Sequence, residues 1–181
     1  MKELADEKLM AMVQQGKLNY MELLFVKYQK QIYNYFLKCT LDREESHDLT
    51  QNTFVRVMKY RNSFKADRGF RVWLFQIARN QVKDHYRSRQ NSLDQFNHEE
   101  DVTSLADESM SHEQMEQEQH LHTALSKLPP DKRELLVMSK FQGLKYEEIA
   151  EIRDSSVSAI KVQVHRTIAQ LRKIYFDEIN G

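Results

Sequence analysis

The chain has 181 residues, of which only four are Gly and two are Pro, and most of the others are helix formers. This composition predicts an all-α protein. Apolar runs are only a few residues long, which excludes a membrane-spanning helix, and no basic segment followed by an apolar one opens the chain, so we expect a cytoplasmic protein. The single cysteine, Cys39, excludes an internal disulfide and is expected to be a small core residue of a helix.

Basic and acidic residues are equal in number, 27 each, but they are distributed unevenly along the chain. Residues 1–89 contain 17 Lys/Arg against 10 Asp/Glu. Residues 90–126 contain nine acids and no Lys/Arg, and residues 127–181 contain ten bases against eight acids. The pattern indicates a basic first domain, an acidic connector and a weakly basic second domain.

Residues 1–89 are predicted to form a four-helix domain. Apolar periodicity and end signals indicate helices at Ala5–Gln15, which Gly16 ends, at Leu18–Cys39, from an Asp42 N-cap through Met58, and at Phe70–Arg89. A polar loop from Arg61 to Gly69 precedes the last of them. Four helices with apolar faces can bury one core between them, so we expect a bundle.

The most basic stretch runs from Arg56 to Arg89, where ten Lys/Arg stand against two acids and aromatic residues lie among the charges. Cations neutralise phosphates, and aromatic rings stack on unpaired bases. Opposite the apolar side of the predicted Phe70–Arg89 helix is a row of three cations, Arg79, Lys83 and Arg87. Like charges at this spacing cost an isolated helix about 0.2–0.5 kcal/mol per pair. A polyanion would remove that cost, so the row favours nucleic acid over a merely solvated face.

Residues 90–112 lack sustained apolar periodicity and are rich in Ser, Asn, Asp and Glu. Such a segment cannot bury enough apolar surface to offset the entropy of ordering, so we predict an acidic flexible linker. Composition alone fits both a solvated tether and a segment that contacts a partner. A protease is expected to cut first between Gln90 and His112 and to release two folded pieces.

Residues 113–181 are predicted to form a second small helical domain. Helices are expected at Glu113–Lys127, from an Asp131 cap through Phe141, at Tyr146–Arg153 and at Val157–Tyr175, with breaks at Pro129-Pro130 and Gly143. The last two helices are joined across Asp154-Ser155, with Ser156 as N-cap. This is the layout of a helix-turn-helix.

The last of these helices has a core side and a distinctive outer side. Ile160, Val164 and Leu171 share one face and are expected in the core. The outer face carries short side chains at its first turns and Lys or Arg further along, which suits entry into a major groove. Val162 is apolar yet expected to be exposed, and a thymine methyl group would suit it. A helix-turn-helix with a structural role only is the alternative.

The polar residues form no pattern typical of a catalytic or metal site. His120 and His122 are two residues apart, so their rings point to different helix faces, and with His112 they are expected on a solvated surface rather than at a metal. The sequence has no phosphate-binding Gly-rich loop, no His-Glu-x-x-His and no nucleophile elbow. We therefore expect no enzyme activity and no cofactor.

Two motifs together carry a family resemblance. The first is Asp48-Leu-Thr-Gln-Asn-Thr-Phe54, a short loop, and then Phe70-Arg-Val-Trp-Leu-Phe-Gln-Ile-Ala-Arg-Asn80-Gln-Val-Lys-Asp84. The second is the segment 143–152 followed by 156–166. In this order and spacing the chain resembles the bacterial sigma factors of the small, two-domain extracytoplasmic-function type. The first motif is similar to their promoter-melting region and the second to their −35-reading domain.

The resemblance implies an initiation subunit of bacterial RNA polymerase, with roles for specific residues. The polymerase clamp would bind Asp48, Gln51, Asn52 and Val55. A flipped −10 base would be captured in the loop by Arg61, Asn62, Ser63, Phe64 and Arg68. The duplex upstream would be held by Arg79, Asn80, Lys83 and Arg87. The −35 element would be read by Ser156, Ser158, Lys161, Val162, His165 and Arg166.

The resemblance also implies core RNA polymerase, promoter DNA and an anti-sigma factor as partners, with no membrane insertion. The family usually has Thr and Arg where this chain has Ala159 and Gln163, so the phosphate contact near Ala159 and the base preference do not carry over. Two other readings remain: a free-standing helix-turn-helix regulator, which would bind an operator by itself, and a helical interaction protein that binds no DNA. The second does not explain the 79/83/87 row or an exposed Val162.

Overall fold

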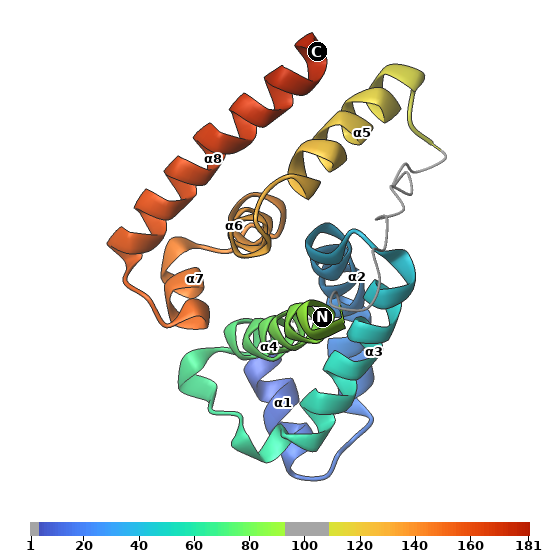
Figure 1. Cartoon of the computed structure of the whole chain (residues 1–181). Helices are drawn as coiled ribbons and strands as arrows, with labels where there is room; N and C mark the ends of the chain where they lie inside the picture. Colours follow the sequence, from blue (N-terminus) through green and yellow to red (C-terminus); the bar gives the residue numbers. More distant parts are fainter. Residues whose placement is uncertain (1–3, 93–108) are drawn as a thin grey trace.

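A computed structural model describes residues 4–92 and 109–181, and every regular element in these two ranges is helical (Figure 1). Residues 93–108, which make up most of the predicted linker, lie outside the described residues. The elements are α1 (Asp6–Gln14), α2 (Tyr20–Thr40), α3 (Arg43–Lys59), η1 (Arg61–Ser63), η2 (Ala66–Arg68), α4 (Phe70–Ser92), α5 (His112–Ser126), α6 (Pro130–Leu136), η3 (Val137–Phe141), α7 (Tyr146–Arg153) and α8 (Val157–Asn180). None of the helices in the described ranges is long and apolar enough to cross a membrane.

Local signals in the sequence account for most of the helix ends. The Asp42 side chain accepts a hydrogen bond from the Glu45 N–H at 2.9 Å, and Ser156 Oγ accepts one from the Ala159 N–H at 3.1 Å, so both predicted N-caps are confirmed. Gly16 follows α1 with a φ of 90°, in the left-handed region that favours glycine.

Two predicted boundaries in the second half differ from the structure. Asp131 was predicted as an N-cap, but α6 begins at Pro130, so Asp131 lies in its first turn and its carboxylate is free to pair with Arg153 at 2.7 Å. Pro is favoured at a first helical position because its missing N–H would have no partner there. The predicted helix through Phe141 also changes character, because η3 (Val137–Phe141) is π-helical.

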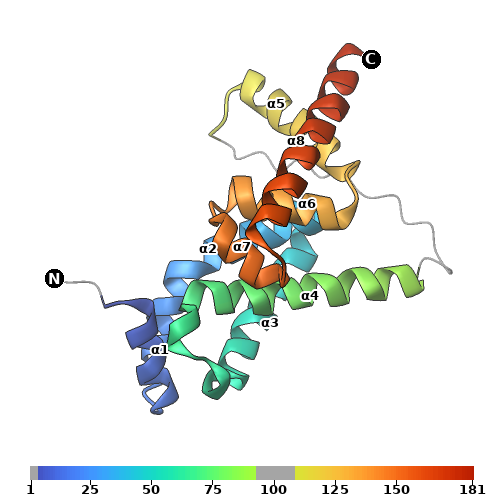
Figure 2. The ribbon, with the colours of Figure 1, turned by 90° about the vertical axis from the view of Figure 1, so that its left-hand side faces the viewer.

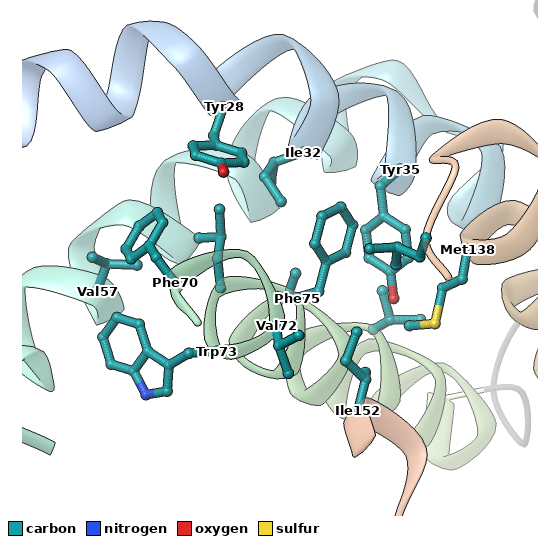
Figure 3. Close-up of a cluster of buried hydrophobic side chains, with 14 of the residues drawn as sticks. Tyr28, Ile32, Tyr35, Val57, Phe70, Val72, Trp73, Phe75, Met138 and Ile152 are labelled. Carbon is teal, nitrogen blue, oxygen red and sulfur yellow. The ribbon is translucent and has the colours of Figure 1, made fainter. Parts of the chain in front are cut away.

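Helices α1 to α4 form the first unit, residues 4–92. Helix α2 lies at its centre and packs against α1, α3 and α4. The core is aromatic: the Tyr28 and Phe70 rings lie 5.5 Å apart, and the Tyr35 and Phe75 rings meet edge to face at 5.4 Å (Figure 3). Cys39 is fully buried in this core, as predicted, and burial raises the pKa of its thiol.

Helices α5 to α8 form the second unit, residues 109–181, and this unit packs directly on the first. Figure 2 shows α6 and α7 lying against α2 and α4, and α7 is in contact with α4. Met138 of η3 and Ile152 of α7 are buried in the same hydrophobic cluster as Tyr35 and Phe75 (Figure 3). The sequence predicted two domains joined by a linker, and in the structure the two units also share a core. We call this contact surface the seam: α6, η3 and α7 form one side of it, and α2 and α4 form the other.

The far end of the second unit has a smaller core of its own. Leu125, Leu128 and Leu136 are buried there, and Leu171 and Ile174 of α8 pack against them. Helix α8 extends to Asn180, five residues beyond the predicted end. The result is a long helix whose first turns are free of α5 and project the helix-turn-helix outward (Figure 1).

Candidate nucleic-acid interface

The outer face of the helix-turn-helix at the start of α8 is open to solvent. Ile160 and Val164 are buried, whereas all six residues predicted to read DNA are exposed: Ser156, Ser158, Lys161, Val162, His165 and Arg166. Val162 is 47 % exposed, as predicted. No Asp or Glu lies between Ser156 and Phe176, so the charged side chains on this face are all basic. Its shape and charge suit a major groove.

Helix α4 departs from the prediction. Asn80, Lys83 and Arg87 are exposed, but Arg79 is only 9 % exposed and does not share their free surface. The sequence predicted one apolar side around Leu74, yet Val72 and Phe75 are buried as well. The physical reason is the seam, because α7 covers the side of α4 that carries Val72 and Arg79.

Arg79 is held by acids of the second unit. Its Nε lies 3.4 Å from Glu134 Oε2, and its Nη2 lies 4.0 Å from Asp131 Oδ1. The Nε contact lacks hydrogen-bond alignment, so it is a charge contact rather than a good hydrogen bond. Glu134 is also bound by Arg153 Nη1 at 2.9 Å and by the Tyr35 hydroxyl, which donates to its Oε1 at 2.8 Å. The four side chains form a buried polar network that crosses the seam.

The pKa of Glu134 reflects two opposing influences. Burial raises it above its ordinary value, and the positive charges of Arg79 and Arg153 and the Tyr35 hydrogen bond draw it down again. Burial dominates, so the net direction is upward. The Tyr35 hydroxyl has a raised pKa for the same first reason, burial, and the Glu134 charge adds to it.

The loop between α3 and α4 is held in place by α1. Gln14 Nε2 donates to the carbonyl oxygens of Arg61 and Phe64, at 2.8 and 3.0 Å, and Glu7 Oε1 accepts from the Phe70 N–H at 3.1 Å. The sequence analysis missed Glu7 and Gln14, because nothing local indicates that α1 reaches this loop. These hydrogen bonds from Gln14 and Glu7 fix both ends of the loop.

The predicted loop contacts fall into two groups. Asn62, Ser63 and Arg68 are exposed, and Arg61 is half-buried with its Nη1 donating to the Met58 carbonyl at 2.7 Å. Phe64 is 6 % exposed, with its ring 5.3 Å from that of Trp73. The Phe64 ring therefore anchors the loop to the core and does not line its outer surface.

The outer face of α3 carries the residues predicted to bind polymerase. Asp48, Gln51 and Asn52 are exposed, and Val55 is 63 % exposed. Beside them lies a shallow groove of about 550 Å³ between α2 and α3, lined by apolar side chains that include Met21, Phe25, Phe54 and Met58. An exposed apolar groove of this kind suits a partner protein better than solvent.

Of the three histidines predicted on a solvated surface, His112 is exposed and only His122 contradicts the prediction. His122 is buried, at 5 % exposure, while His120 is partly exposed and faces the Tyr175 ring at 6.5 Å. Their different surroundings follow from the two-residue spacing. Among the described residues, no group of three or more His, Cys, Asp or Glu side chains could hold a metal ion.

Comparison with known proteins identifies the family. The chain matches the models for Sigma-70 region 2, over residues 24–92, and Sigma-70, region 4, over residues 118–171. It is 31 % identical over 162 residues to RNA polymerase sigma factor YlaC of Bacillus subtilis, a match that covers 84 % of this chain and 90 % of that protein. It is 30 % identical over 159 residues to RNA polymerase sigma factor CarQ of Myxococcus xanthus, with 88 and 91 % covered. The chain belongs to the extracytoplasmic-function sigma factors of the sigma-70 family. Sigma factors are non-enzymatic transcription initiation factors that bind RNA polymerase and promoter DNA.

Two solved structures share the fold. The structure of CnrH in complex with the cytosolic domain of CnrY matches with a TM-score of 0.72, over 94 % of this chain and 97 % of that one, at 23 % identity. RpoE of Bartonella quintana, solved with the anti-sigma factor NepR, matches with the same score over 84 and 94 % of the two chains, also at 23 % identity. The all-helical fold predicted from the sequence is confirmed.

Proposed function

We propose that this sigma factor reads the −35 element with α8 and opens the promoter at the −10 element by capturing an unpaired base. The observation that carries the first part is the exposed face of α8. Lys161 and Arg166 can reach guanine or phosphates, Ser156 and Ser158 leave room for close approach, and Val162 can contact a thymine methyl group.

The loop from Arg61 to Phe70 is the proposed site of base capture. Asn62 and Ser63 offer hydrogen-bond donors and acceptors at its exposed tip, and Arg68 offers a charge for a nearby phosphate. Because Gln14 and Glu7 hold both ends of the loop, its polar groups are positioned before DNA arrives. The sequence has no motif for nucleotide hydrolysis, so the energy of strand opening would come from trapping the unpaired base.

The duplex next to the melted region would lie along α4, on Asn80, Lys83 and Arg87, with Arg79 completing the row once it is free of the seam. Each cation placed on a phosphate releases condensed counterions, which makes this contact strongly salt-dependent.

Core polymerase would bind the outer face of α3. Asp48, Gln51 and Asn52 provide polar contacts there, and Val55 with the adjoining groove provides an apolar centre. This combination of apolar centre and polar rim is typical of protein interfaces. An anti-sigma factor is a further expected partner, since CnrH was solved in complex with the cytosolic domain of CnrY and RpoE with the anti-sigma factor NepR.

Run-off transcription tests the proposal. The full chain, mixed with core polymerase and a linear promoter library with randomised −35 and −10 positions, is expected to co-purify with the polymerase and to enrich specific sequences at both elements. Transcription that does not depend on the added chain would overturn the proposal.

A loop graft tests base capture separately. Replacing residues 61–69 with the loop of a related sigma factor is expected to change preference at one −10 position by about 1–3 kcal/mol and to leave −35 preference unchanged. With 2-aminopurine at that position, fluorescence is expected to rise as the base unstacks. An unchanged −10 preference with normal polymerase binding would make the loop a simple connector.

A further inference from the structure

Helix α8 exposes one polar side chain that the proposed −35 contacts leave without a role, the amide of Gln163. The residue is exposed and lies in the second turn of the helix, directly after Val162 and three residues before Arg166. Among the described residues its side-chain amide makes no hydrogen bond, and the bond from Thr167 Oγ1, at 2.7 Å, goes to the backbone carbonyl of Gln163 instead. The oxygen and the NH₂ group of the amide are therefore both open to a ligand.

The neighbours of Gln163 leave its path toward the start of α8 clear. Side chains in an α-helix lean toward its N-terminus and cover the turn before their own Cα. For Gln163 that turn holds Ala159, four residues earlier, whose side chain is a single methyl group. The amide therefore extends toward the first turn of α8. In a helix-turn-helix, the first turns of the recognition helix are the part that contacts base edges.

A second glutamine on the same side of α8 provides a comparison within the molecule. Gln170 lies two helical turns after Gln163, so the two side chains share a face. The oxygen of its amide is already engaged, because Lys132 Nζ donates to Gln170 Oε1 at 2.8 Å. Gln170 also lies about 10 Å farther from the first turn, at 1.5 Å per residue. Of these two amides, the one of Gln163 is both open and near the end of the helix expected to enter the groove.

The chemistry of an amide matches one base better than the others. A glutamine side chain has a donor group and an acceptor at the same end. In the major groove adenine presents the complementary pair, the N7 acceptor beside the N6 donor, and glutamine binds both at once. Guanine and thymine present acceptors without a donor, so they would leave the amide oxygen unpaired, and cytosine would leave the NH₂ group unpaired. An unpaired polar group in a closed interface costs binding energy.

We propose that Gln163 specifies an adenine in the −35 element, donating to N7 and accepting from the N6 amino group in the major groove. This inference rests on the function proposed above for α8. The charges of Lys161 and Arg166 hold the helix against the DNA, and Gln163 then selects the base. The methyl group of Ala159 leaves the space through which the amide reaches the base edge.

The promoter library with randomised −35 positions tests this assignment. With core polymerase, the unaltered chain is expected to favour adenine at one −35 position by roughly 5- to 150-fold, the range for a good bidentate pair. Gln163→Ala should remove the preference at that position and keep it at the others. Gln163→Arg should move it to guanine, whose O6 and N7 match an arginine. Gln170→Ala is the matched control and should leave every position unchanged.

Removal of a single acceptor atom from the base gives a second readout. In 7-deazaadenine a C–H group replaces N7, while the Watson–Crick edge is unchanged. In place of the selected adenine, this base is expected to weaken promoter binding by the polymerase complex of the unaltered chain about fivefold, measured by competition against a labelled promoter duplex. It should have no effect on the complex of the Gln163→Ala chain. An equal loss in both complexes would mean that another residue contacts this adenine, and the proposal fails.

The proposed function and the role of Gln163 fail in different ways. If the unaltered chain enriches no −35 sequence, the reading of DNA by α8 is overturned, and the role of Gln163 with it. If a −35 element is enriched but Gln163→Ala changes no position, or weakens all sequences equally, the role of Gln163 alone is overturned. The same holds if the position that Gln163→Ala relaxes favours a base other than adenine. Because Gln163 is exposed, thermal unfolding of its variants should match that of the unaltered chain, which separates lost selectivity from lost folding.

Discussion

Helices α4 and α8 were both predicted to bind DNA along one face, but the structure shows that the two predicted faces differ in exposure. On α8 all six predicted residues are exposed, whereas on α4 the row 79/83/87 is split, with Arg79 buried against Glu134. Both helices have an amphipathic pattern. The difference lies in what covers the outer face: on α8 nothing among the described residues does, and on α4 the second unit does.

The contrast teaches that periodicity identifies a helix's apolar side but not every surface that will be buried. Val72 and Phe75 lie away from the Leu74 side of α4, and both are buried. Two apolar residues beside a cation row are the signal that could have indicated a second contact surface. On α4, the charged face with apolar neighbours is covered in part by another unit of the same chain.

The largest effect is expected where α7 covers α4. Ile152→Ala removes a buried side chain that α7 contributes to the shared core, and it is expected to lower the free energy of unfolding by about 2–5 kcal/mol in urea denaturation. Val162→Ala, on the free face of α8, is the control and should change it by less than about 0.5 kcal/mol. Similar small values for both variants would mean that the seam contributes no stability.

The next largest effect is expected on the exposed face of α8. Lys161→Ala and Arg166→Ala are each expected to weaken −35 recognition by about 1–3 kcal/mol and to shift base preference, measured with polymerase on the randomised library. Both residues are exposed, so thermal unfolding should be unchanged. An equal loss on every sequence would mean that they contact phosphate only, and no loss would remove α8 as the reading helix.

Arg79→Ala should affect the stability of the free chain, unlike its row neighbours. Glu134 would keep Arg153 and Tyr35 but lose one compensating charge in a buried site, at a cost of about 1–2 kcal/mol in urea denaturation. Lys83→Ala and Arg87→Ala, both at exposed positions, should stay within about 0.5 kcal/mol. A uniform result across the row would contradict the difference in burial between these cations.

The smallest expected effect is a dependence of the free energy of unfolding on pH, through Glu134. Burial raises the pKa of Glu134 in the folded chain above that in the unfolded chain, with Arg79, Arg153, Tyr35 and Asp131 as its charged or polar neighbours. The folded state therefore holds the proton more tightly, and the contribution of this group to stability is lost as pH rises from its ordinary value of 4.5 through the raised one. Glu134→Gln cannot ionise, so its stability should fall less over that window. Parallel curves for the two proteins would show that the pKa is not raised.

The sequence was sufficient wherever a local rule decides the outcome. Asp42 and Ser156 cap their helices through side chains three residues from their partners, and Gly16 ends α1 through its own backbone freedom. It was insufficient where distant segments meet. The bond between Tyr35 and Glu134 joins residues 99 positions apart, and Gln14 reaches a loop 47 to 50 positions away. No periodicity within one helix carries such information.

The π-helical turn η3 has a consequence for how the chain tolerates insertions and deletions. The Gln142 N–H bonds to the Val137 carbonyl, five residues back, where an α-helix would span four. The turn thus contains one residue more than a regular helix, and each residue of an α-helix rotates the chain by about 100°. Deleting one residue from 137–141 would restore an α-helix and turn the Gln142 carbonyl away from Arg71 and Gln31. The angular register of the whole helix-turn-helix on the first unit therefore depends on a single extra backbone residue.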